Sequence, residues 1–205
     1  MEFVKHIAVV VIGYLIGAIP VGHIAAKSLR GVDVTKIASG RTGASNVLRA
    51  AGPVAAIITA LGDAAKGMLG VVIGRLVGST PLAAALAASA VVIGHDCSVF
   101  LGWGGGVGTV ANLGATSILA GPVAAGLAAI GALVLGIWRY SSLASMAIAV
   151  LLPIALLIWA SATGEPMVYV LHGLISGGVA LWSLRPNIQR LLSGTERRLG
   201  DKTES

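Results

Sequence analysis

Seven apolar segments follow one another along the chain, separated by polar stretches, at about 7–27, 53–76, 81–96, 109–120, 121–138, 143–162 and 166–184. A helix of about 20 apolar residues crosses the roughly 30 Å hydrocarbon core of a bilayer, and six of the segments have that length or come near it. The segment at 109–120 is much shorter. The pattern predicts an all-α polytopic membrane protein, and no linker marks a second domain within residues 1–205.

Composition leads to the same fold class. Hydrophobic residues make up 56% of the chain and charged residues 11%, which leaves too little charged surface for a soluble domain. The 29 glycines, among them Gly13 and Gly17 one helical turn apart, indicate closely packed helices. The segment Ile7 to Ala26 lacks an A-x-A-like cleavage site before a polar mature domain, so we interpret it as a retained spanning helix and not as a secretion signal.

The distribution of Lys and Arg distinguishes seven crossings from six. With an outward N-terminus and seven crossings, Lys5 and Arg75 lie outside, Lys66 lies within a helix, and the cytoplasmic side holds Lys27, Arg30, Lys36, Arg41, Arg49, Arg139, Arg185, Arg190, Arg197, Arg198 and Lys202. If the segment at 109–120 only dips into the membrane, most cations fall outside. The positive-inside rule therefore predicts seven helices and a cytoplasmic C-terminus. The net charge of +6 then marks cytoplasmic loops, and no soluble basic face is left for nucleic acid.

The polar stretch at 31–49 carries the most informative chemistry. It places hydroxyl, amide and cationic side chains among glycines, just before a helix that Pro53 can open. Phosphate oxygens only accept hydrogen bonds, so a loop rich in such donors suits a phosphate group. The alternative is an ordinary positively charged cytoplasmic loop.

Two ionisable residues fall inside the second apolar segment. Asp63 and Lys66 are three residues apart and share one face of a helix. Either charge facing lipid would cost roughly 2.5–3.5 kcal/mol, so both should face the protein interior and pair. The pair could belong to a functional pocket or be purely structural.

Two further polar stretches are expected on the same side of the membrane. His95 is followed by a glycine-rich loop, residues 102–108, whose backbone could approach a ligand closely. The tail from Arg185 to Glu196 is predicted to form a short amphipathic helix, which could simply anchor the chain to anionic headgroups. The histidines are isolated from Cys and carboxylate clusters, so no metal site is predicted.

Taken together and in order, these stretches resemble the acyl-phosphate-dependent glycerol-3-phosphate acyltransferases of bacterial membranes. The similar positions are Lys27, Gly31, Asp33, Ser39-Gly40-Arg41-Thr42-Gly43-Ala44-Ser45-Asn46, Arg49, Asp63-x-x-Lys66-Gly67, Gly94-His95, Arg139-Tyr140-x-Ser142-Leu143-x-Ser145 and Asn187-x-x-Arg190-x-x-x-Gly194-x-Glu196. The resemblance extends from about Gly13 to Gly200.

The resemblance implies a fold of seven helices with the N-terminus outside. It implies transfer of a fatty acyl group from acyl phosphate to the 1-hydroxyl of glycerol 3-phosphate, without a cofactor, on the cytoplasmic side of the bacterial cell membrane. Ser39, Arg49 and Asn187 would be catalytic. The substrate-binding residues would be Lys27, Gly40, Arg41, Gly43, Asn46, Asp63, Lys66, His95, Gly105, Gly106, Gly108 and Arg190.

The chain departs from the family pattern in the glycine-rich loop. Gly104 and Val107 stand where the family carries lysines, while Arg41 replaces a neutral residue and could restore one positive charge. The alternative to an active enzyme is therefore a degenerate member that binds anions, or a small transporter. An internal repeat, which a transporter would be expected to show, is not visible. The His-x4-Asp motif of acyl-CoA-dependent acyltransferases is also absent, so acyl phosphate is the expected donor.

Overall fold

The computed structural model describes residues 2–200, so Lys202 lies outside the described residues. Within them the fold is all-helical, as predicted. The α-helices are α1 Glu2–Ala18, α2 Val21–Arg30, α3 Ala44–Ala51, α4 Pro53–Gly78, α5 Pro81–Asp96, α6 Thr109–Leu119, α7 Gly121–Trp138, α8 Ser141–Thr163, α9 Tyr169–Ser183 and α10 Arg185–Leu192. Two short 3-10 helices, η1 Val34–Lys36 and η2 Val99–Leu101, lie in the loops.

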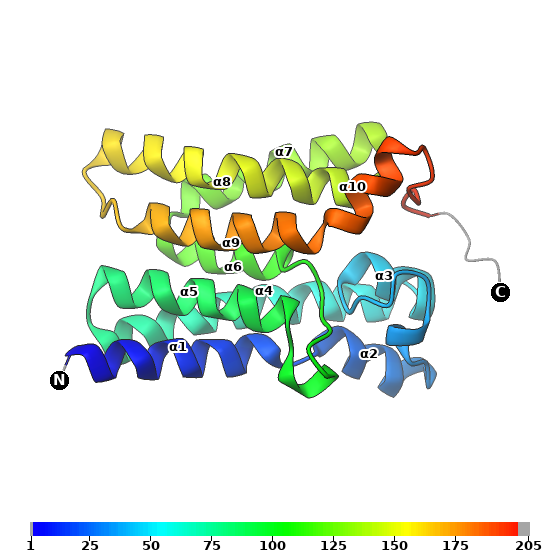
Figure 1. The fold of residues 1–205 in the computed structure, drawn as a ribbon, viewed down its shortest axis with the longest axis horizontal. Helices are drawn as coiled ribbons and strands as arrows, with labels where there is room; N and C mark the ends of the chain where they lie inside the picture. The colour runs from blue at the N-terminus through cyan, green and yellow to red at the C-terminus, as the bar shows by residue number, and fades with distance from the viewer. Residues whose placement is uncertain (1, 201–205) are drawn as a thin grey trace.

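The long helices run side by side along the longest axis of the molecule (Figure 1). The short helices α2, α3 and α10 gather at the end opposite the N-terminus, together with the α7–α8 junction and residues 97–108, which we call the glycine loop. We call this end of the bundle the polar end. The α8–α9 turn lies with the N-terminus at the other end.

The first apolar segment is not one helix, which corrects the prediction of a single continuous helix. The chain breaks between α1 and α2 at Ile19 and Pro20. Proline has no backbone N–H to continue the hydrogen-bond ladder, and its ring collides with the preceding turn. The break leaves α1 as the apolar part and makes α2 a separate amphipathic helix at the polar end.

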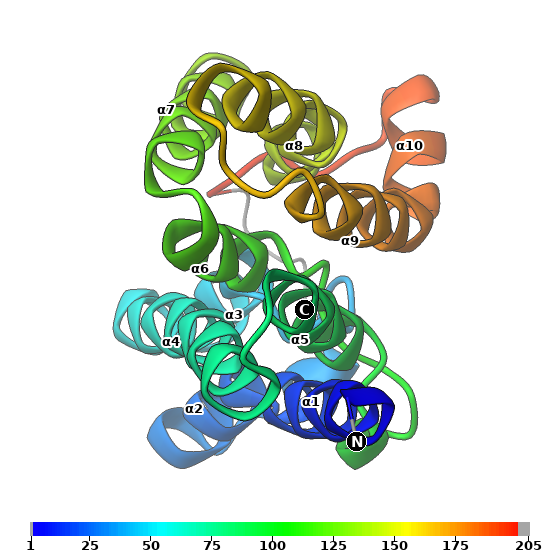
Figure 2. The same ribbon diagram turned by 90° about the vertical axis from the view of Figure 1, so that its left-hand side faces the viewer.

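Glycines set the spacing between helices, as predicted. A Cβ added to Gly13 would lie 2.8 Å from the Ala87 carbonyl oxygen of α5, and one added to Gly17 would overlap the backbone of Val91. Gly74 of α4 packs just as closely on α5. The helices α1, α4 and α5 therefore form one tightly packed group, which Figure 2 shows on one side of α6, with α7, α8 and α9 on the other side.

Five stretches of the described chain are long and apolar enough to cross a membrane, with α1 and α2 counted as one stretch. The helix α6 is the short one: its 11 residues extend only about 16 Å, at about 1.5 Å per residue. The glycine loop precedes it and returns from the polar end into the bundle. A multi-pass membrane fold with one shortened helix follows from these lengths.

Candidate functional site

A cavity of about 290 Å³ lies at the polar end, where the two halves of the bundle meet. One part of it is polar and is lined by the 39–49 loop, the glycine loop, α10 and the tail beyond it. The other part is apolar and lies among α6, α7 and α8. We call these the polar arm and the apolar arm.

Asn46 holds the 31–49 loop together. Its side-chain amide donates to the carbonyl oxygens of Ile37 at 3.1 Å and of Arg41 at 2.9 Å, and its carbonyl oxygen accepts from the Ser39 amide at 3.4 Å. Asn46 was expected to bind substrate; it lines the cavity, but its amide hydrogens are committed to loop carbonyls. Its side chain therefore holds the backbone of the loop in place, and with it the neighbours Ser39 and Arg41 that line the cavity.

Asp33 fixes the other end of this loop. The hydroxyl and the amide of Thr35 donate to its carboxylate at 2.6 and 3.1 Å. Both hydrogen bonds favour the ionised form and hold the pKa of Asp33 below its ordinary value. Asp33 is thereby the N-cap of η1, and the hydrogen bonds fix the first turn of this short helix.

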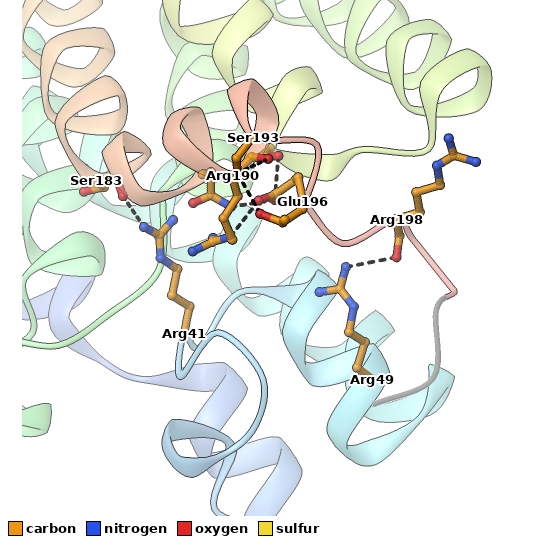
Figure 3. A network of polar contacts seen from close by, with 10 residues as sticks. Arg41, Arg49, Ser183, Arg190, Ser193, Glu196 and Arg198 are labelled. Carbon is orange, nitrogen blue, oxygen red and sulfur yellow. Dashed lines mark hydrogen bonds and ion pairs between the residues drawn. The ribbon is translucent and has the colours of Figure 1, made fainter. Parts of the chain in front are cut away.

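Two arginines of this stretch reach the polar arm. Arg41 extends to the end of α9, where its guanidinium donates to the carbonyl oxygen of Ser183, and Arg49 donates to the carbonyl oxygen of Arg198 at 3.3 Å (Figure 3). Burial lowers the pKa of Arg41, while the Asp96 carboxylate opposes that shift. A guanidinium stays protonated at neutral pH all the same, so a cation is present in this wall.

The glycine loop leaves no room for side chains at three positions. A Cβ at Gly105 would overlap backbone oxygens of α5, and one at Gly106 would overlap the His95 ring. Gly108 has a left-handed φ of 65°, and a Cβ there would lie 2.8 Å from an Asp96 carboxylate oxygen. The Gly105 carbonyl accepts from the amide of Thr42 at 3.2 Å, which ties the two loops together.

Asp63, Lys66 and His95 form a buried group beneath the glycine loop. Lys66 Nζ lies 3.0 Å from an Asp63 carboxylate oxygen, and His95 Nδ1 lies 3.4 Å from the same oxygen. Lys66 also donates to the carbonyl oxygen of Ile19, at the break between α1 and α2, over 3.1 Å. The predicted inward-facing pair is therefore confirmed, with His95 as a third member.

The tail brings a carboxylate into the polar arm. Glu196 accepts hydrogen bonds from Asn187 Nδ2 at 2.7 Å, Arg190 Nε at 2.8 Å and the Ser142 hydroxyl at 2.9 Å. Burial alone would raise the pKa of Glu196, but these donors outweigh it and the pKa lies below its ordinary value. Asn187 Oδ1 is buried without a hydrogen-bond partner among the described residues.

The last described residues cross the polar end as a strap, residues 193–200. Arg139 and Leu199 exchange two hydrogen bonds, from the Leu199 amide at 2.6 Å and from the Arg139 guanidinium at 2.8 Å. The carbonyl of Arg198 accepts from Arg49, as described above, and Figure 3 shows this contact between α3 and the strap. The strap thus links α3 to the α7–α8 junction.

The apolar arm is lined by small and aliphatic residues. Leu113 of α6, Leu135 of α7 and Ile148 of α8 form its walls, and Ala128 and Gly131 leave space on α7. A Cβ at Gly131 would lie 2.7 Å from the end of the Ile148 side chain. The arm can therefore accommodate an alkyl chain.

The structure brings most of the expected site residues to this one cavity: its lining includes Ser39, Arg41, Gly43, Asn46, Arg49, Asp63, His95, Gly106, Gly108, Asn187 and Arg190. Gly40, Gly105 and Lys66 are not part of that lining. Lys27, expected to bind substrate, is not part of it either: its side chain is exposed on α2. After the break at Pro20, α2 is a separate helix, which the sequence pattern did not indicate.

Several residues of the site were not anticipated. Asp96, Ser142 and Ser183 contribute hydrogen bonds around the polar arm, and Glu196 places its carboxylate at the centre of three donors. Ser142 and Glu196 are positions of the family motifs to which the sequence assigned no role, whereas the only signal for Asp96 and Ser183 is proximity to motif residues. Val107 lines the cavity with an apolar side chain, so the glycine loop adds no cation to it.

A helical membrane bundle with a cavity at one end that is cationic in one part and apolar in the other suits an amphipathic anion. The chain belongs to the glycerol-3-phosphate acyltransferase family, a family of membrane enzymes, whose sequence model matches residues 7–194. The resemblance seen in the motifs is thereby confirmed.

Individual relatives agree over nearly the whole chain. The glycerol-3-phosphate acyltransferase of Rubrobacter xylanophilus is 40% identical over 197 residues, covering 96% of each chain. That of Synechococcus sp. strain JA-3-3Ab is 42% identical over 192 residues, covering 93% of this chain and 91% of the relative. The crystal structure of PlsY, an integral membrane glycerol 3-phosphate acyltransferase, in its glycerol 3-phosphate form is 31% identical with a TM-score of 0.84, covering 95% of this chain and 96% of that one.

Proposed function

We propose that this protein transfers a fatty acyl group from acyl phosphate to the 1-hydroxyl of glycerol 3-phosphate and so forms lysophosphatidic acid. The observation that carries the proposal is the union of a polar arm with arginines and an apolar arm in one cavity. Both the acyl donor and the product combine a phosphate with an alkyl chain. PlsY, the structural neighbour, has been crystallised in glycerol 3-phosphate and lysophosphatidic acid forms.

The polar arm supports binding of the phosphate groups. Arg41 and Arg49 line it together with the Ser39 hydroxyl, and guanidinium groups match phosphate oxygens with paired donors. The glycine loop lets the backbone approach at Gly106 and Gly108, where no side chain fits. These groups would hold donor and acceptor side by side.

The reaction needs little more than orientation, because acyl phosphate is already activated. The 1-hydroxyl oxygen forms a bond to the acyl carbon, the bond from that carbon to the phosphate oxygen breaks, and the hydroxyl proton leaves with the phosphate. Positioning and stabilisation of the developing oxyanion supply much of such a rate enhancement. We assign these roles to Ser39, Arg49 and Asn187; the unpartnered Asn187 Oδ1 is an acceptor for a substrate hydroxyl.

We place the polar end in the cytoplasm, with seven crossings, an outward N-terminus and one membrane domain over residues 1–205. Arg49, Arg139 and Arg198 are linked at one end of the bundle, as seven crossings require. Trp138 is the last residue of α7 and Trp182 the last but one of α9, and both side chains are exposed, as in an aromatic belt at the membrane interface. Excess Arg beside such a belt marks the cytoplasmic face of a bacterial cell membrane.

An assay of the purified protein in lipid vesicles, with acyl phosphate and labelled glycerol 3-phosphate, tests the proposal by the formation of labelled lysophosphatidic acid. Arg49→Ala should lose nearly all transfer, since one charge-assisted contact accounts for roughly 10- to 150-fold. Lys5→Ala, at the opposite end, is the matched control and should transfer like the parent. A folded parent that binds glycerol 3-phosphate without transfer would instead support the anion-binding alternative, which the apolar Val107 favours.

A further inference from the structure

Arg41 joins the two halves of the bundle at the polar arm. It comes from the loop before α3, and its guanidinium reaches the carbonyl of Ser183, the last residue of α9 (Figure 3). The carboxyl end of a helix carries the negative end of the helix dipole, so a cation is favoured there. The acceptor is a neutral carbonyl oxygen, so this contact does not neutralise the positive charge of Arg41.

The side chain of Ser183 connects this arginine to a buried carboxylate. Its hydroxyl donates to Asp96 Oδ2 at 2.8 Å, while its carbonyl accepts from Arg41. Asp96 is only 6% exposed and ends α5, where the helix dipole disfavours a negative charge. A buried carboxylate in such a place needs a compensating cation. Arg41 and Lys66 are the cations that act on it, and the neighbouring residue His95 is the third titratable group near it.

The second oxygen of Asp96 points at the glycine loop. Asp96 Oδ1 is buried without a hydrogen-bond partner among the described residues, and a Cβ at Gly108 would lie 2.8 Å from it. The carboxylate is therefore behind the loop, while Arg41 lines the cavity in front. The loop itself has no Lys or Arg between residues 97 and 108. Arg190, another arginine of the lining, is paired with Glu196.

We propose that Asp96 and Ser183 are positioning residues that hold Arg41 toward the polar arm, where Arg41 binds the phosphate of glycerol 3-phosphate. The proposal rests on the proposed function for the identity of the ligand. It assigns roles to two residues that would not touch the substrate. It also makes phosphate binding depend on the seating of α9 against α5, because Ser183 and Asp96 come from these two helices.

Binding of glycerol 3-phosphate to the full-length protein in vesicles, measured by calorimetry, distinguishes positioning from simple charge. If Asp96 were only a nearby negative charge, Asp96→Asn would remove a repulsion and tighten binding of the phosphate. If Asp96 positions Arg41, the same variant weakens binding, by roughly three- to tenfold, within the loss expected for one charge-assisted contact. Tighter binding would overturn the proposal.

A double-mutant cycle supplies the second measurement. Arg41→Ala should weaken binding about tenfold or more, and adding Asp96→Asn should then cause no further loss, because the carboxylate has no arginine left to position. Independent losses that multiply would overturn the proposal. Glu165→Gln, an exposed carboxylate at the other end, is the control and should bind like the parent. Thermal unfolding of each variant identifies any that has lost its fold.

The same variants separate this inference from acyl transfer. In the transfer assay, Asp96→Asn and Ser183→Ala should raise KM for glycerol 3-phosphate and leave kcat within about twofold, since both act through binding. A parent that binds glycerol 3-phosphate without transferring acyl groups refutes the proposed reaction, and the binding cycle still decides the role of Asp96. A parent that binds no glycerol 3-phosphate refutes both.

Discussion

Polar residues at the polar end interact either with neighbours on their own helix or with residues from distant parts of the chain. Only interactions of the first kind could be predicted from the sequence. The pairing of Asp63 with Lys66 could be predicted because charges inside an apolar helix must find partners. The hydrogen bonds to Glu196 could not be predicted, because the tail must fold back before Glu196 meets its donors Asn187, Arg190 and Ser142. The role of Asn46 in its own loop was hidden for a similar reason. An asparagine side chain can bind a phosphate group or hold a loop together through hydrogen bonds to its backbone, and the sequence does not distinguish the two.

Glu196 should make stability depend on pH. Its folded pKa is depressed, so its contribution is complete above the ordinary value of 4.5 and is lost as the pH falls through the lower folded value. The contribution is on the order of 1 kcal/mol, given partial solvent screening. Thermal unfolding of the parent and of Glu196→Gln between pH 7 and pH 3.5 measures it. The difference between the two should shrink toward acid pH; a constant difference would contradict the prediction.

Lys66→Met should be strongly destabilising, because it leaves the Asp63 carboxylate buried without its ammonium partner. Breaking a buried pair in this way typically costs about 3–5 kcal/mol. The double variant Asp63→Asn/Lys66→Met should recover much of that loss. Denaturant unfolding in detergent compares the three proteins, and equal stability of Lys66→Met and the parent would show that the pair is unimportant.

Helices were predicted well by apolar length, and their interruptions were not. The start of α4 at Pro53 and the order of the long helices follow from the sequence pattern. The separation of α1 from α2 does not follow from that pattern, because the apolar segment continues through Pro20. Hydropathy alone does not reveal that proline lacks the backbone N–H that a continuous helix needs. The short α6 was visible as a short apolar segment, but the return of the glycine loop into the bundle was only suggested by its glycines.

The close approach of α1 and α5 gives a prediction at the level of helices. Gly17→Leu should destabilise the protein by about 1–3 kcal/mol or more, because its side chain would enter the backbone of α5 at Val91. Gly136→Leu on α7 is the matched control, since no atom lies within 4 Å of a Cβ there. Thermal unfolding in the same detergent checks both. Equal unfolding temperatures for the two variants would argue against the tight α1–α5 interface.

The whole molecule is two helical groups joined at the polar end, by Arg41 reaching α9 and by the strap. Neither link could be foreseen from spacing, since Arg41 and Ser183 are 142 positions apart and Arg49 and Arg198 are 149 positions apart. The side of the membrane is different: it follows from the distribution of cations along the entire chain. The orientation in the membrane can therefore be predicted from the sequence, although no single contact in the structure determines it.

The lone Cys97 provides a test of orientation. It is exposed at the polar end, so a membrane-impermeant maleimide should label it in inverted vesicles and not from outside the cell. The variant Cys97→Ser/Glu165→Cys carries its thiol at the opposite end and should show the reverse pattern. Labelling of Cys97 from outside would reverse the proposed topology.

The break at Pro20 has a consequence for the electrical balance of the membrane interior. A continuous helix hides its carbonyl oxygens in its own hydrogen bonds, whereas an interrupted one exposes them. The carbonyl of Ile19, at this interruption, receives the ammonium of Lys66 from a different helix. The backbone thereby stands in for water where water is scarce. Closing the gap, for example with Pro20→Ala, would straighten the chain and withdraw the oxygen that makes a buried lysine tolerable.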